Sequence, residues 1–89
     1  MTEQKLAHPK GITEQKLEEF VVSELRWEGP RAEIADAWLI DLLDSLAIMK
    51  TVAFIEHEFN ITLEDDEIVP KNFETLRALV AFVGGKLAR

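Results

Sequence analysis

Apolar residues recur at helical spacing in three stretches of the chain. In the first stretch they follow one another at i, i+3, i+4 and i+8, which is typical of a helix with one buried face. They are Leu17, Phe20, Val21 and Leu25. Thr13 is expected to cap this helix, and Gly29-Pro30 is expected to end it.

The second stretch predicts a helix that begins at Ser45 and ends near Asn60. The pair Asp44-Ser45 supplies the capping chemistry, because short polar side chains accept hydrogen bonds from the N–H groups of a first turn. The face expected to point into the core consists of Leu46, Met49, Val52, Ala53, Ile55 and Phe59.

A last helix is expected after Asn72, anchored at its start by Phe73 and frayed at its end by Gly84-Gly85. Its apolar face consists of Leu76, Leu79, Val80 and Val83. Ahead of it, the acidic run at residues 64–67 is expected to form one helical turn before Pro70. We interpret this run as a solvated face and not as a calcium loop, because the ligand spacing of such loops is absent.

Between the first two helices, residues 31–44 hold apolar side chains without a clean period. They predict a long loop that packs inward and has room for a short helical turn, and loops of this length are usually functional. Trp38 is expected to pin the loop by packing, and Trp27 to be partly buried at a helix end. No stretch predicts a strand. The expected fold is therefore a small all-α bundle of three main helices and one short helix, with a long first loop.

The size and composition of the chain are those of one globular domain, with 89 residues and an apolar fraction of 47%. Residues 1–11 are polar and are expected to be a flexible leader before a single domain at residues 12–89. The chain has no cysteine, which excludes a disulfide framework and a thiolate metal site. His8 and His57 lack the spacing of metal ligands, and we interpret His57 as a solvated side chain.

Hydropathy and charge limit the partners. No stretch is long and apolar enough to span a membrane, and the N-terminus lacks the apolar segment of a secretory signal, so a cytoplasmic location is expected. The net charge of −7 argues against nucleic acid as a partner, because no run of basic residues is present to neutralise phosphates. We expect a monomer whose protein partners carry basic patches or make apolar contacts.

Three segments carry a resemblance to a known family. The sequence LLDSL at residues 42–46 runs into a hydrophobic helix that ends in an acidic-Phe pair at residues 58–59, and FETL at residues 73–76 opens the last helix. In this order and with the long first loop, residues 12–87 resemble the acyl and peptidyl carrier proteins.

This resemblance implies a chemistry for the serine. Ser45 would open the second helix and receive 4′-phosphopantetheine from coenzyme A. Asp44 and Leu46 would complete the attachment triplet, with Asp44 forming part of what the transferase recognises. The protein would be a carrier and not an enzyme, holding its cargo as a thioester on the arm. Its partners would be a phosphopantetheinyl transferase, an acyl or aminoacyl ligase or transferase, and downstream biosynthetic enzymes.

Elementary electrostatics favours the same place for the arm. A serine at a helix N-terminus lies beside unsatisfied N–H groups and the positive end of the helix dipole, so a phosphodiester there is stabilised. One alternative stays open, in which Ser45 is only a helix cap and the chain is an unmodified helical interaction module with the carrier fold. A hydrolase that uses Ser45 is disfavoured, because no histidine is placed near it and no G-x-S-x-G loop is present.

The chain departs from the family pattern at three positions. Leu42 stands where many carriers have a glycine, and Ala47 and Lys50 stand where carriers of fatty acid synthesis usually bear acidic residues. The Leu-Leu-Asp-Ser form is more similar to stand-alone carriers of natural-product pathways and to D-alanine carriers than to the housekeeping carriers of fatty acid synthesis. This likeness implies a specialised biosynthetic pathway and leaves acyl and aminoacyl cargo both open.

The same departures bear on how partners dock. If the stripe through Leu46 faces inward, Ile48 is expected to point outward or to lie at the boundary. The predicted docking residues are therefore Ile48, Ala47 and Lys50. Because residues 46–54 hold no acidic side chain, partners are expected to bind there by apolar contact more than by charge.

Overall fold

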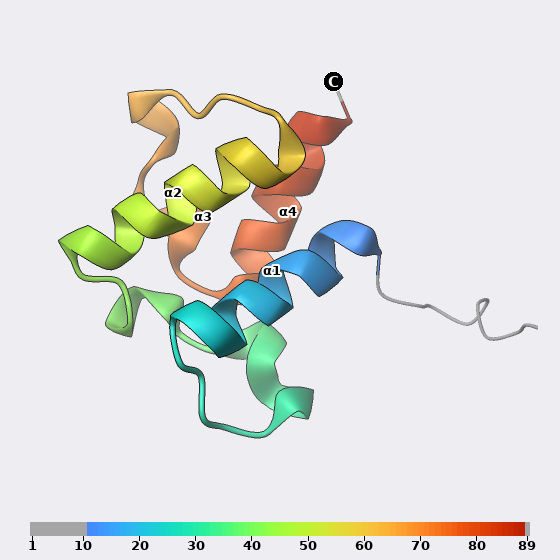
Figure 1. Cartoon of the computed structure of the whole chain (residues 1–89), viewed down its shortest axis with the longest axis vertical. Helices are drawn as coiled ribbons and strands as arrows, with labels where there is room; N and C mark the ends of the chain where they lie inside the picture. The colour runs from blue at the N-terminus through green and yellow to red at the C-terminus, as the bar shows by residue number, and fades with distance from the viewer. Residues whose placement is uncertain (1–10, 89) are drawn as a thin grey trace, which may run out of the picture.

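The computed structural model describes residues 11–88, which form an all-α fold (Figure 1). The α-helices are α1 (Ile12–Glu24), α2 (Ser45–Phe59), α3 (Pro70–Phe73) and α4 (Leu76–Leu87), and the 3-10 helices are η2 (Arg31–Asp36), η3 (Leu39–Asp41) and η4 (Asp65–Glu67). Extended pairing in this range is limited to one isolated bridge between Trp38 and Thr75. The predicted all-α class is confirmed. Apart from Gly11, the predicted leader at residues 1–11 lies outside the described residues.

The helix α1 begins and ends earlier than the sequence pattern predicts. Gly11 is its N-cap and Thr13 lies inside the first turn, so the cap predicted at Thr13 is wrong. The helix ends at Glu24, and two residues later Arg26 adopts a left-handed conformation with φ of 61°. A left-handed residue cannot continue a right-handed helix. The end predicted at Gly29-Pro30 is therefore wrong, because the chain has already left the helix.

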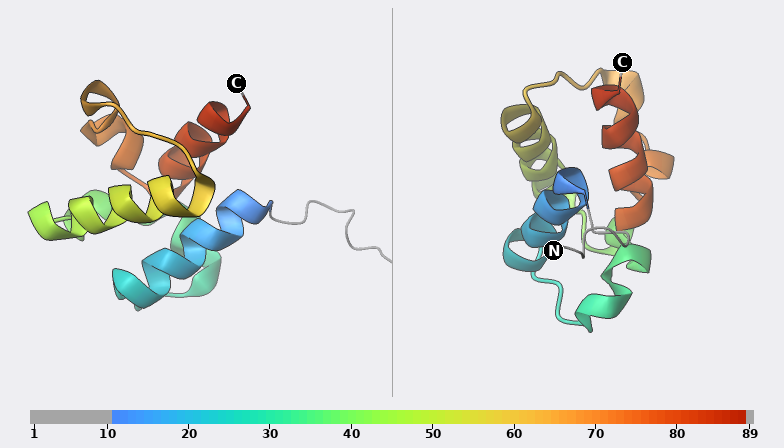
Figure 2. Two further views of the ribbon diagram at one scale, coloured as in Figure 1. Left: turned by 45° about the horizontal axis from the view of Figure 1, so that its top comes forward. Right: turned by 90° about the vertical axis from the view of Figure 1, so that its right-hand side faces the viewer.

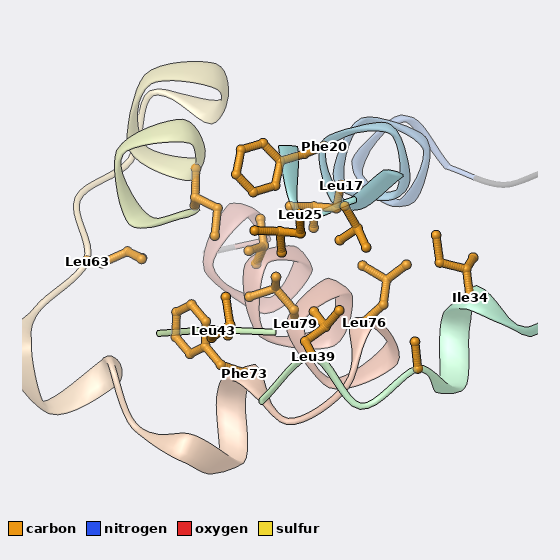
Figure 3. Close-up of a cluster of buried hydrophobic side chains, with 14 residues drawn as sticks. Leu17, Phe20, Leu25, Ile34, Leu39, Leu43, Leu63, Phe73, Leu76 and Leu79 are labelled. Carbon is orange, nitrogen blue, oxygen red and sulfur yellow. The ribbon is translucent and has the colours of Figure 1, made fainter. Parts of the chain in front are cut away.

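The core surrounds α4, which packs against α1, α3 and η2. Figure 3 shows side chains from these elements pointing toward one another around it. The predicted apolar face of α4 is confirmed at Leu76, Leu79 and Val83, whose side chains are fully buried. The other buried apolar side chains are Leu17, Phe20, Val21, Leu25, Ile34, Ala37, Leu39, Leu43, Ile55, Leu63 and Phe73. Each large side chain in this set stabilises the fold by about 1.5–3 kcal/mol relative to an exposed one.

The start predicted for the last helix is wrong. The helix α4 does not follow Asn72 directly, because Thr75 opens a new helix whose first turn it caps. The Thr75 hydroxyl oxygen accepts a hydrogen bond from the N–H of Ala78 at 3.1 Å. Phe73 is buried as predicted, but it belongs to the separate short helix α3.

The end predicted for the last helix is also wrong. Gly84-Gly85 do not fray the helix, which continues to Leu87. Lys86 in the last turn forms an ion pair with Glu67 of η4 at 2.8 Å, and both side chains are largely buried. The acidic run at residues 64–67 forms one turn as predicted, with residues 64–66 exposed. Glu67 departs from the predicted solvated face, because it anchors this turn to the end of α4.

The first loop packs inward, as predicted, and its backbone is tied to the start of α4. Leu39 is fully buried, and its N–H donates to the carbonyl of Glu74 at 2.7 Å. Asp36 forms an ion pair with Arg77 at 3.0 Å, which raises the pKa of the Arg77 guanidinium. The side chain of Trp38 is 58% exposed, so the prediction that its ring pins the loop is wrong. The neighbouring backbone holds the loop instead.

The helix α2 turns a different face to the core from the one its apolar pattern predicts. Thr51 and Ile55 are buried and Ile48 is half-buried, whereas Leu46 and Met49 are 68% and 69% exposed. The first turns of α2 lie at one extremity of the molecule (Figure 2), so no other element covers these two side chains. Ala53 is exposed as well. The interpretation of Leu46, Met49 and Ala53 as core is therefore wrong. No helix within residues 11–88 is long and apolar enough to cross a membrane.

Candidate functional site

Asp44 organises the junction between the first loop and α2. Its backbone is extended, with φ of −77° and ψ of −178°, and its carboxylate accepts a hydrogen bond from the N–H of Ala47 at 2.8 Å. The preceding residue, Leu43, is buried and anchors the end of the loop in the core. The predicted start of α2 at Ser45 is confirmed, and the cap of the helix is Asp44 alone. The alternative role of Ser45 as the cap is wrong, because Asp44 fills it.

The Ser45 hydroxyl is available for chemistry. Ser45 is the first residue of a 15-residue helix, its side chain is exposed, and the hydroxyl makes no hydrogen bond within residues 11–88. The amides of Ser45 and Leu46 have no acceptor within the helix, because it begins there. Together with the positive end of the helix dipole, they favour a phosphate group at this point. The residues present therefore fit the attachment of a phosphopantetheine arm.

Two ion pairs and one aromatic contact hold α2 against α1. Glu24 pairs with Lys50 at 3.3 Å, and Lys16 pairs with Glu58. The hydrogen bond from Lys16, helped by its charge, lowers the pKa of the Glu58 carboxyl below its ordinary value. Between these pairs, the rings of Phe20 and Phe54 stack with centroids 4.4 Å apart. These contacts hold the part of α2 from Lys50 to Glu58 against α1.

The exposed apolar side chains of the described residues gather on the elements next to Ser45. Six large ones are exposed, and four of them belong to the end of the first loop or to the first turns of α2. These four are Trp38, Leu42, Leu46 and Met49. We call Leu46 and Met49 the apolar patch, since they lie three residues apart on the exposed face of α2.

The residues predicted for docking differ in exposure. Ala47 and Ile48 are half-buried and pack against the core, so Ile48 lies at the boundary, which is one of the two positions expected for it. Lys50 is exposed as expected, although its ammonium group pairs with Glu24. Sequence reasoning missed the apolar patch because it placed Leu46 and Met49 in the core. No sequence signal distinguishes the two faces, since both carry apolar residues at helical spacing.

Shallow apolar grooves run along α2 next to the apolar patch. One of about 80 Å³ lies between η3, α2 and α3, and its walls include Ile40, Ile48 and Phe73. A second of about 320 Å³ continues along α2 past Met49 and Val52. Ile48 lines both grooves. Both grooves are shallow and offer apolar surface along α2.

Among the described residues, no histidine lies near Ser45 to act as the base of a serine hydrolase. His57 lies on the same helix twelve residues further on, about 18 Å away at the helical rise, and is exposed as predicted. His8 lies outside the described residues. In the range 11–88, no group of three or more His, Asp or Glu side chains is placed to hold a metal ion.

Comparison with known families agrees with this geometry. The family model described as "Phosphopantetheine attachment site" matches residues 15–83, which include Ser45 and most of the chain. No curated protein and no solved structure matches the chain.

Proposed function

The chain belongs to the phosphopantetheine attachment site family, and on this premise we propose that Ser45 carries the arm. Domains of this family bear 4′-phosphopantetheine covalently on a serine and act as carriers that catalyse no reaction themselves. The sequence has two serines, Ser23 and Ser45. Ser23 lies inside α1, where its hydroxyl donates to the carbonyl of Glu19 at 2.8 Å. Ser45 opens α2 with an exposed, unbonded hydroxyl, and this difference carries the assignment.

The surrounding residues suit this role. When the arm is bound, its terminal thiol holds the cargo as a thioester. Leu43 is buried and fixes the chain one residue before Asp44, which in turn fixes the first turn of α2. The arm therefore moves on a rigid anchor. The carboxylate of Asp44 and the exposed side chain of Leu46 flank the attachment hydroxyl, and we propose that a transferase reads them together.

Partner enzymes would dock on the apolar patch beside the arm. Carriers of this family work with phosphopantetheinyl transferases and with biosynthetic enzymes. Leu46 and Met49 offer uncovered apolar surface within two turns of Ser45, whereas Ile48 and Ala47 support them from behind. An exposed apolar pair of this kind contributes to binding once a partner covers it.

Two further proposals concern the enzymes that load the cargo and the pathway in which the carrier acts. The partners that load the arm would be an acyl or aminoacyl ligase or transferase, and the Leu-Leu-Asp-Ser form supports a specialised biosynthetic pathway. The absence of acidic residues from the first turn of α2 supports the same assignment. The cytoplasmic location and the monomeric state expected from the sequence stay predictions.

The deciding experiment is the mass of the intact protein after incubation with coenzyme A and a broad-specificity phosphopantetheinyl transferase. We expect one phosphopantetheine on the parent chain and on Ser23→Ala, which is the matched control, and none on Ser45→Ala. An arm on Ser45→Ala would place the attachment elsewhere. A parent chain that is never modified would favour the unmodified interaction module.

A further inference from the structure

A groove on the first loop brings two tryptophans together with three carboxylates. It has a volume of about 530 Å³, and its walls include Trp27, Trp38, Glu33, Asp36, Asp41 and Leu42. We call it the Trp groove. Its last wall residue precedes Ser45 by three positions, so the Trp groove lies on the loop that leads into the attachment helix.

The two tryptophans of the Trp groove are held in different ways. Trp38 is 58% exposed, which is unusual for so large an aromatic side chain, and its backbone is bridged to Thr75. Trp27 is half-buried and lies over Gly29, where an added Cβ would be 2.4 Å from the ring carbon Cζ2. The buried Nε1 of Trp27 has no hydrogen-bond partner within residues 11–88.

The carboxylates give the Trp groove a negative charge. Asp36 is already paired with Arg77. Glu33 and Asp41 are exposed, and neither has an ion-pair partner in the described part of the chain. A cation attracted by these two carboxylates would also meet the negative faces of the indole rings. A guanidinium group suits both the carboxylates and the indole rings, because it forms paired hydrogen bonds with a carboxylate and stacks on an aromatic ring.

We propose that the Trp groove binds an arginine side chain of a partner enzyme that acts on the arm. The proposal rests on the carrier function assigned above and adds a second contact to the apolar patch. Contacts on the first loop and on α2 lie on the two sides of Ser45 along the chain. A partner held at both would be fixed in orientation as well as in position, with contacts on the segments that precede and follow Ser45 in the sequence.

The test uses a blocked Gly-Arg-Gly-Arg-Gly peptide as the probe and the full chain labelled with ¹⁵N. The sequence has two tryptophans, and both line the Trp groove, so the indole Nε1–H region of the NMR spectrum reports on this groove alone. We expect the peptide to shift both indole signals in a saturable way. A peptide with citrulline in place of arginine has nearly the same shape without the charge, and we expect it to leave the signals in place.

Variants separate the groove from the overall acidity of the chain. Glu33→Gln combined with Asp41→Asn should weaken binding of the arginine peptide about tenfold, as expected for loss of charge-assisted contacts. Asp65→Asn combined with Asp66→Asn removes the same charge from the exposed η4 turn and should change the affinity by less than about twofold. The pattern of the remaining NMR signals shows whether each variant is folded.

Three results would overturn the proposal: indole signals that ignore the arginine peptide, equal shifts from the citrulline peptide, or equal losses in the two double variants. The mass experiment at Ser45 is independent of this one. Modification without peptide binding would reject the arginine site and leave the carrier function intact. Peptide binding without modification would reject the carrier function at Ser45 and leave the arginine site intact.

Discussion

The roles of Asp44 and Ser45 can be separated by their effects on stability. The Ser45 hydroxyl is exposed and unbonded, so Ser45→Ala removes no contact and adds a better helix former. We expect its free energy of unfolding to stay within about 0.5 kcal/mol of the parent value. Asp44→Ala removes the acceptor of the 2.8 Å hydrogen bond from Ala47, and the loss of such a cap costs about 0.5–2 kcal/mol. Urea unfolding followed by circular dichroism measures both.

A third variant isolates recognition from stability. Asp44→Asn keeps an acceptor oxygen for the first turn, so its stability should stay close to that of the parent. If the Asp44 carboxylate is part of what the transferase reads, this variant should be modified more slowly although it is folded. The reasoning fails if Ser45→Ala destabilises the protein by more than Asp44→Ala does, because the hydroxyl of Ser45 would then be the cap.

Three further outcomes are expected. Leu76→Ala should cost about 2–5 kcal/mol in urea unfolding, because the side chain is fully buried, and a loss below about 0.5 kcal/mol would contradict its place in the core. Met49→Glu should slow loading by a partner enzyme at unchanged stability, whereas Ile48→Glu should lower the stability itself; the reverse order would restore Ile48 as the exposed contact. Lys16→Gln should raise the pKa of Glu58, read from its carboxyl carbon by NMR, since Lys16 is the main cause of its lowering. The parent pair should therefore stabilise the fold above the ordinary carboxyl pKa and lose that contribution as the pH falls through the lowered value, and an unchanged Glu58 pKa in the variant would refute this.

The sequence was sufficient where a local signal decides the structure. The start of α2 follows from the capping chemistry of Asp44, and the buried face of α4 follows from a single apolar stripe with no competitor. The helix α2 has apolar residues on two faces, and only its place in the bundle decides which face is covered. Because its first turns extend past the core, Leu46 and Met49 stay exposed.

The Trp groove is a second feature that could not be predicted from the sequence. Trp27 precedes η2 and Trp38 follows it, and nothing in their spacing predicts that they line the same groove. Their approach depends on the fold of the whole first loop, which is set by its contacts with the start of α4. The hydrogen bond from Leu39 to Glu74 is one of these contacts, and it joins residues 35 positions apart in the sequence.

The buried core that stabilises the fold is separate from the exposed start of α2. The fully buried side chains lie in α1, the first loop, the later turns of α2 and α4, and none of residues 45–50 is buried. Leaving Leu46 and Met49 exposed gives up about 1.5–3 kcal/mol for each side chain that burial would have contributed. A carrier gains from this arrangement, because partners would reach uncovered apolar surface beside Ser45, the proposed attachment residue. Since Asp44 caps α2, an arm on Ser45 would leave both the first turn and the core unchanged.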